Sequence, residues 1–141
     1  MNNKLKVLYV SAECAPFIKV GGLGDVAGEL PLKLKELGVD IRVVIPGNKD
    51  IDYPTLYKGD YPVNLGWRKE TCIVREIINA PVKTFIIDNY HYFGRQGVYG
   101  HNDDGERFAL FCAAVYEMIL RFDFKPDIIH LNDWHTAPVA M

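Results

Sequence analysis

The sequence predicts an α/β fold with a mainly parallel β-sheet and helices on both faces. Two apolar, β-branched runs, "KVLYV" at 6–10 and "IRVVIP" at 41–46, are typical of parallel strands that are buried on both sides. A helical pattern lies between them, and such a strand, helix, strand unit almost always crosses over right-handed into a parallel sheet. A second helical pattern precedes a further apolar run, "DIIHLN" at 127–132, which adds another strand.

The first helix is predicted from about residue 23 to residue 37. Its apolar positions recur at helical spacing: Leu23, Val26, Ala27, Leu30, Leu34 and Leu37. Gly38 is placed to end the helix. Pro31 lies inside the pattern, so we expect a kink there and not a break.

The middle of the chain is less regular. Residues 47–70 show no sustained period and predict an irregular excursion. The runs "CIVREII" and "VKTFIID" read as two strands joined by a short turn at 79–81. Residues 89–105 are rich in glycine and aromatic residues and predict a long surface loop, a kind of segment that is usually functional.

The second long helix follows this loop. Asp103 and Glu106 have the spacing of a capping box at its start. Its apolar stripe comprises Phe108, Phe111, Cys112, Val115, Met118, Ile119 and Phe122. After the strand at 127–132, "DWHTAPVAM" is expected to begin another helix, and because that helix has no C-cap we expect the chain to continue in a longer protein.

Composition limits the class of protein. Sixteen Lys and Arg against 18 Asp and Glu give a net charge of −2, which provides no broad basic surface for nucleic acid or an anionic membrane. Three scattered cysteines predict neither a disulfide framework nor a CxxC metal site. With no secretory leader and no apolar run of bilayer length, we expect a cytoplasmic protein.

The strongest chemical signal is "KVGGLGDVAG" at 19–28. Gly21 and Gly22 directly precede the predicted helix, whose free N–H groups and dipole favour an anion, and glycine lets the backbone approach a phosphate closely. Lys19 adds a positive charge. The pattern fits a phosphate or diphosphate site at the carboxyl edge of the sheet. An ordinary turn beside a solvated lysine is the alternative.

Two better-known glycine loops fit less well. A P-loop needs its lysine after the glycines, whereas Lys19 precedes them. "GLGDVAG" is only a loose form of the dinucleotide fingerprint, since residues 11–21 separate it from the strand and no acidic residue closes the second strand. A nicotinamide dinucleotide-binding oxidoreductase domain therefore stays as a weaker alternative.

Four blocks in order carry a family resemblance: "KVLYVSAECAPFIKVGGLGDVAGELPLKL", "YFGRQGVYG", "ERFALFCAA" and "PDIIHLNDWHTA". Together they resemble the bacterial glycogen synthases and plant starch synthases of glycosyltransferase family 5, over most of the chain apart from about residues 47–75. The resemblance implies a GT-B fold of two Rossmann-like domains facing across a cleft. Residues 1–141 would then be part of the N-terminal, starch synthase catalytic domain, without the C-terminal nucleotide-binding domain.

The resemblance also implies the reaction and the site. Glucose would pass from ADP-glucose to the non-reducing end of an α-1,4-glucan such as glycogen, with retention and without a metal or other cofactor. Donor contacts are expected at Lys19, Gly21, Gly22 and Asp25. The vicinity of the sugar or acceptor is expected at Asp133, His135, Glu13, Arg95 and Tyr99.

Structural roles remain open for several of these residues. Glu13 could instead cap backbone N–H groups, Asp133 could cap the next helix, and Tyr99 could anchor its loop. His135 could be a packed imidazole. We expect His130 to belong to the core, and Trp67 and Trp134 to pack rather than to serve as binding platforms.

Departures from the family and the missing half limit what the chain can do. Val20 replaces a threonine, Gly24 an alanine, and Gly94 an acidic residue of many relatives, which changes the glycine loop and the glucan contacts. The Arg, Lys and Glu that stabilise the leaving group in the family lie in the second domain, and the resemblance places a further histidine at a position that we expect beyond Met141. We therefore expect the chain alone to be inactive. Another GT-B transferase with a different donor and a non-catalytic glucan-binding module are the remaining alternatives.

Overall fold

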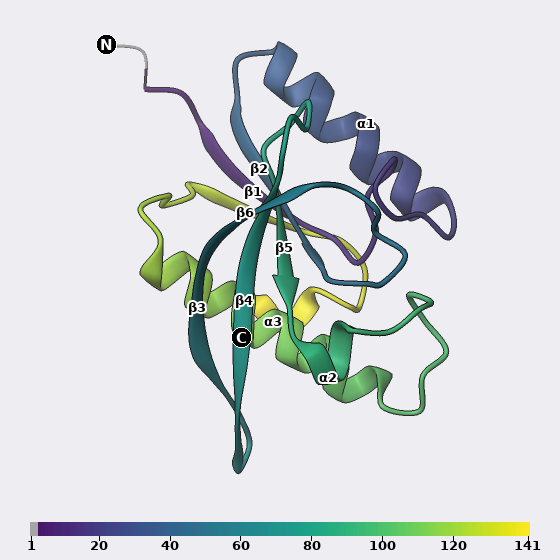
Figure 1. The fold of residues 1–141 in the computed structure, drawn as a ribbon. Helices are drawn as coiled ribbons and strands as arrows, with labels where there is room; N and C mark the ends of the chain where they lie inside the picture. Colours follow the sequence, from purple (N-terminus) through teal and green to yellow (C-terminus); the bar gives the residue numbers. More distant parts are fainter. Residues whose placement is uncertain (1–2) are drawn as a thin grey trace.

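A single mixed β-sheet organises the chain. The computed structural model describes residues 3–141 and contains a six-stranded sheet with the order β3-β4-β5-β2-β1-β6 (Figure 1). The parallel part comprises β1 (Lys6–Val10), β2 (Asp40–Pro46), β5 (Thr84–Asp88) and β6 (Ile128–Leu131). The antiparallel part comprises β3 (Thr55–Leu65) and β4 (Arg68–Ile77). The predicted strands at 6–10, 41–46, 72–78, 82–88 and 127–132 are thus confirmed, and so is the α/β class.

Helices cover both faces of the sheet, as predicted. Helix α1 (Gly22–Glu36) lies on one face and α3 (Asp104–Arg121) on the other (Figure 1). Side chains that alternate along the strands supply both cores. Val7, Tyr9, Ile41, Val43 and Ile45 belong to the cluster on the α1 side. Leu8, Val10, Val44, Phe85 and Ile87 belong to the cluster on the α3 side.

The buried face of α1 agrees only in part with the predicted stripe. Its buried residues are Gly24, Ala27 and Pro31, whereas Val26 and Leu37 are 51% and 80% exposed. Small residues face inward because the backbone of the preceding loop lies against the helix: a Cβ on Gly28 would stand 2.7 Å from the Ala15 carbonyl oxygen. Leu30 and Leu34 of the predicted stripe pack partly buried against the core on this side, as expected.

The end of α1 and its proline agree with the sequence. Gly38 has φ 92°, its N–H donates to the Lys35 carbonyl, and the Val39 N–H donates to the Leu34 carbonyl. These two bonds form a Schellman motif, which needs a left-handed residue at this position. The helix continues through Pro31 without a break.

The segment 47–70, predicted to be irregular, is mostly sheet. Strands β3 and β4 form a long hairpin that projects from the body of the molecule (Figure 1). Only the later part of β3 packs on the core, through Tyr61 and Val63, and a register shift between Tyr57 and Gly59 disturbs the alternation, which explains why the sequence pattern was weak. The prediction that Trp67 packs is wrong, because it lies at the hairpin turn with 92% of its surface exposed.

The last third of the chain holds smaller differences. A short helix, α2 (Tyr90–Phe93), interrupts the predicted loop at 89–105, and its first turn is capped by the Asn89 side chain. Asp103 makes no capping hydrogen bond at the start of α3. The helix expected after β6 is a 3-10 turn, η1 (Ala137–Ala140).

Strand β6 is less buried than expected. It pairs only with β1, and Ile128 and Ile129 remain 47% and 40% exposed. His130, expected in the core, is half-buried with its ring 4.6 Å from the Tyr9 ring. In the described part of the chain, no helix is long and apolar enough to cross a membrane.

Candidate functional site

A cleft of about 430 Å³ opens at the carboxyl edge of the sheet. Strands β1 and β6 are parallel neighbours, so the loops that follow them emerge side by side. The residues that line the cleft are Glu13, Val20, Gly21, Gly22, Leu23, Tyr99, Asp104, Asp133, Trp134 and His135. Six of the nine predicted site residues are among them, namely Glu13, Gly21, Gly22, Tyr99, Asp133 and His135.

Glu13 holds three segments together at the base of the cleft. One carboxylate oxygen accepts hydrogen bonds from the backbone N–H groups of Val20 (2.9 Å), Gly21 (3.1 Å) and Gly24 (3.1 Å). The other accepts from the Tyr99 hydroxyl at 2.5 Å. Burial by itself would raise the pKa of Glu13, but the hydrogen bonds from Tyr99 and the backbone outweigh it and lower the pKa. The capping role that the sequence left open for Glu13 is therefore present.

The start of α1 keeps part of its capacity for an anion. Glu13 occupies the N–H of Gly24 in the first turn, whereas the N–H groups of Gly22 and Leu23 have no acceptor among residues 3–141. No atom lies within 4 Å of where a Cβ would stand on Gly21 or Gly22, so the approach is open. Two free N–H groups and the helix dipole suit one negatively charged oxygen group.

Lys19 and Asp25 pair with each other beside the cleft. The Lys19 ammonium lies 2.8 Å from the Asp25 carboxylate, and the two side chains are 49% and 57% exposed. The cation that was predicted for the donor is thus balanced by a neighbouring anion, and neither residue lines the cleft. Because such an exposed pair contributes at most about 1 kcal/mol, an incoming anion can compete for Lys19 at little cost.

Asp133 projects from a strained turn after β6. Its φ of 63° lies in the left-handed region, and its Oδ1 accepts the Trp134 N–H at 2.6 Å. It does not cap η1, whose N-cap is Thr136. Strain of this kind costs on the order of 1–3 kcal/mol and concentrates at functional sites. Glu13 and Asp104 are saturated by hydrogen bonds, so Asp133 is the carboxylate of the cleft that is most available to a ligand.

His135 carries an unpaired polar atom in the wall of the cleft. The residue is 6% exposed, and its Nδ1 is the one buried side-chain nitrogen or oxygen without a partner in the described part of the chain. The ring stacks on Tyr99 at 4.9 Å and contacts Trp134 at 4.3 Å. Burial lowers the pKa of His135 despite three nearby carboxylates. A neutral imidazole has one donor and one acceptor nitrogen, but Nδ1 itself is buried and not open to the cleft.

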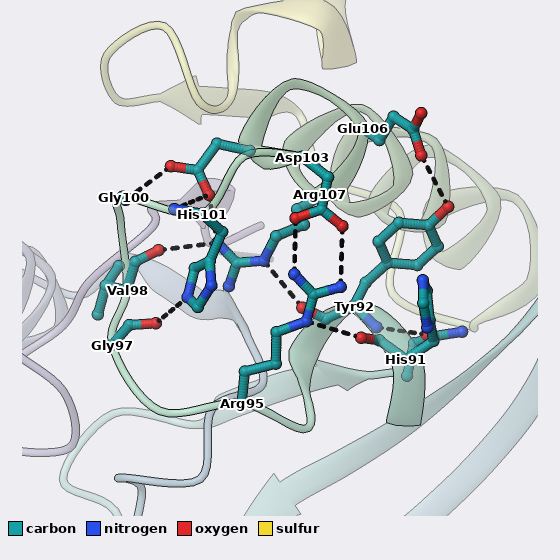
Figure 2. Close-up of polar contacts among 12 residues, drawn as sticks. His91, Tyr92, Arg95, Gly97, Val98, Gly100, His101, Asp103, Glu106 and Arg107 are labelled. Atoms are coloured by element: carbon teal, nitrogen blue, oxygen red, sulfur yellow. Dashed lines mark hydrogen bonds and ion pairs between the residues drawn. The ribbon is translucent and has the colours of Figure 1, made fainter.

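Three residues depart from their expected places. Arg95 does not reach the cleft, because it makes a bidentate pair with Asp103 (2.6 and 2.8 Å) and donates to the His91 carbonyl (Figure 2). Trp134 packs on His135 as expected but also lines the cleft. Asp104 lines the cleft and was missed, since "NDDG" gives no signal that separates its second aspartate from a helix cap.

Comparison with known proteins identifies relatives over almost the whole chain. Residues 6–141 match the family described as "Starch synthase catalytic domain". The glycogen synthase of Lactobacillus acidophilus is 48% identical over 94% of the chain, and that of Geobacillus thermodenitrificans is 48% identical over 96%. The catalytic domain of starch synthase IV from Arabidopsis thaliana, solved with ADP and acarbose, superposes with a TM-score of 0.90 at 31% identity over 98% of the chain.

The relatives are much longer than this chain. The chain spans 29% of the length of each of the two glycogen synthases and 30% of the Arabidopsis chain.

Proposed function

The chain belongs to the family of starch synthase catalytic domains, and on that premise we propose that it is part of a retaining glucosyltransferase. The enzyme transfers glucose from ADP-glucose to the non-reducing end of an α-1,4-glucan such as glycogen. The names of the relatives and the ADP and acarbose bound to the Arabidopsis structure support this reaction class.

One observation in the chain itself carries the proposal. The start of α1 and the Asp133–His135 segment are far apart in sequence, yet both line the same cleft. The first offers free N–H groups to a phosphate, and the second offers a carboxylate, an imidazole and an indole to a sugar. A nucleotide sugar has both kinds of group joined by one bond.

The two ends of the cleft are accordingly assigned to different parts of the substrates. We assign the diphosphate of the donor to the N–H groups of Gly22 and Leu23, beside Gly21, with Lys19 moving from Asp25 to add its charge. We assign the transferred glucose or the glucan end to Asp133, His135 and Tyr99, with Glu13 holding the geometry. Arg95 acts at a distance, through the loop that carries Tyr99.

The chain alone is assigned a binding role and not catalysis. Residues 1–141 would form part of the N-terminal domain, and a C-terminal nucleotide-binding domain would supply the remaining charges around the diphosphate. Removing a single preorganised donor from such a site typically costs 10²–10³-fold in rate. We therefore expect no measurable glucose transfer by the chain alone. Its three cysteines are free thiols, which favours a cytoplasmic enzyme.

The test is an NMR titration of the isotope-labelled chain with ADP-glucose, maltotetraose and NADH in turn. We expect ADP-glucose to shift the amides of Gly22 and Leu23, and maltotetraose to shift the Trp134 indole and the His135 ring. Lys19→Ala should weaken ADP-glucose binding several-fold. Lys33→Ala is the control: it removes a lysine that pairs with Glu36 at the far end of α1, and it should not weaken binding.

The outcomes separate the candidates. A saturable response to NADH alone would support the dinucleotide-binding alternative and overturn the proposal. If maltotetraose binds but Lys19→Ala does not change the affinity for ADP-glucose, the result would favour a non-catalytic glucan-binding module. Robust glucose transfer by the 141-residue chain would show that the division between two domains is wrong.

A further inference from the structure

Arg107 is a buried charge that the proposed chemistry does not use. It lies in the first turns of α3 with 2% of its surface exposed, and it does not line the cleft. Its Nε donates to the Tyr92 carbonyl at 2.8 Å, and its Nη1 donates to the Val98 carbonyl at 3.0 Å and to Asp104 at 2.7 Å (Figure 2). A buried guanidinium is costly unless such partners satisfy it, so its position calls for a role.

Two of the three partners of Arg107 belong to α2 and to the loop that follows it. Two of its three bonds go to backbone carbonyls outside its own helix, at Tyr92 and Val98. Asp104, held by Arg107, accepts in turn the N–H groups of Gly100 and His101. The backbone is therefore fixed on both sides of Tyr99, and Figure 2 shows the guanidinium inside the curve of this loop.

Tyr99 connects the loop that Arg107 fixes to the glycine loop before α1. Its hydroxyl donates to Glu13, whose other oxygen binds the N–H groups of Val20, Gly21 and Gly24. The path from Arg107 to the start of α1 thus runs through hydrogen bonds that are all 3.1 Å or shorter, with Val98 joined to Tyr99 by the chain itself. Rigid, connected groups of this kind are what hold a site in its productive geometry.

We propose that Arg107 is a positioning residue of the cleft: by fixing Val98 and Asp104 it sets Tyr99, and through Tyr99 it sets Glu13 and the glycine loop. The inference rests on the proposed function only for the identity of the ligand. The link between the two loops is a property of the chain without any ligand.

The experiment compares Arg107→Met, which keeps the length of the side chain and removes its donors, with Arg107→Lys and with the unchanged chain. Arg121→Met is the matched control, since it removes an arginine from the other end of the same helix, where it pairs with Glu117. Three quantities are measured by NMR: the amide shifts of Val20, Gly21 and Gly24, the pH titration of the Glu13 carboxyl carbon, and the Kd for maltotetraose.

Arg107→Met should move all three amide signals and shift the Glu13 titration to higher pH, because the hydrogen bond from Tyr99 is lost or weakened. Binding of maltotetraose should weaken about tenfold, the size expected for one hydrogen bond to a charged group. Arg107→Lys keeps the charge but cannot donate to all three acceptors, so it should give intermediate values. Arg121→Met should leave every signal unchanged.

A folded Arg107→Met chain with unaltered amide shifts and an unaltered Glu13 titration would overturn the inference and leave Arg107 a local support of its loop. If Arg107→Met does not fold, Arg107→Lys decides by the same ligand-free signals, and unchanged values there would equally overturn it. Failure of maltotetraose to bind even the unchanged chain would count against the proposed function alone, because the ligand-free signals would still judge the role of Arg107.

Discussion

Replacing Glu13 by glutamine tests the junction on which the candidate site depends. The Glu13 carboxylate is 3% exposed and accepts four hydrogen bonds, three from backbone N–H groups and one from Tyr99. Glutamine has nearly the same shape, and its carbonyl oxygen can still accept from the N–H groups. Its amide nitrogen cannot accept from the Tyr99 hydroxyl, so the substitution Glu13→Gln removes the charge and the acceptor for that one bond.

The size of the effect follows from those four bonds. A hydrogen bond to a charged group contributes about 1 kcal/mol more than a neutral one, so four bonds set an upper limit of about 4 kcal/mol. Relief of the cost of burying a carboxylate opposes this loss. We expect the net decrease in the free energy of unfolding at pH 7 to be about 2 kcal/mol.

The pH dependence supplies the sharper test. Because the folded state lowers the pKa of Glu13 below its usual 4.5, the charge stabilises the fold above that pH. This stabilisation is lost progressively as the pH falls through the folded-state pKa. Urea unfolding followed by circular dichroism at pH 7, 4.5 and 3.5 should therefore show the difference between the unchanged chain and Glu13→Gln shrinking toward acid.

Glu29→Gln is the control, since Glu29 lies exposed on α1. It should change the free energy of unfolding by less than about 0.5 kcal/mol at every pH, as is usual for surface substitutions. A Glu13→Gln chain as stable as the unchanged one at pH 7 would refute the reasoning. So would a difference that stays constant down to pH 3.5.

Three further measurements test the packing. Gly28→Ala should lower the free energy of unfolding by about 1–3 kcal/mol, because the new Cβ would meet the Ala15 carbonyl oxygen at 2.7 Å. Gly21→Ala is the control, since its Cβ would enter open space and should be tolerated; thermal unfolding measures both variants. The three cysteines are buried, and burial raises the pKa values of their thiols to about 11 or 12, so native protein at pH 8 should react with iodoacetamide far more slowly than urea-unfolded protein. Ile129→Lys should reduce concentration-dependent self-association in analytical ultracentrifugation, because Ile129 lies exposed on the free edge of the sheet; equal association of both chains would exclude that edge as the contact.

The sequence predicted those elements in which the spacing of apolar residues matches the side chains that are buried in the structure. The strands at 6–10 and 41–46 are buried on both faces over most of their length, as their nearly continuous apolar runs predict. Helix α1 was placed correctly, but its inward face only in part: Ala27, Leu30 and Leu34 face the core, whereas Val26 does not. The hydrophobic pattern marks large residues, whereas the close approach of Ala15 requires glycine and alanine on that side.

Those residues of the candidate site that lie in recognisable sequence motifs could be predicted. Gly21, Gly22, Asp133 and His135 each follow a strand, so their meeting at one edge follows from a parallel sheet. Pairings between charged neighbours were not predictable. In the structure Asp103 pairs with Arg95, whereas Asp104 pairs with Arg107. The sequence does not distinguish the two aspartates, because both fit the start of the same helix and their pairing depends on the course of the loop.

The two tryptophans of the chain occupy different environments, and this difference allows one of them to serve as an optical probe of the cleft. Trp67 stands in water at the hairpin turn, whereas Trp134 lies against the His135 ring in the wall of the cleft. Replacing Trp67 by phenylalanine would leave one indole, so that all tryptophan emission would come from the site. Protonation of His135, or binding of a sugar beside it, should then change the intensity of the tryptophan fluorescence, without an attached label.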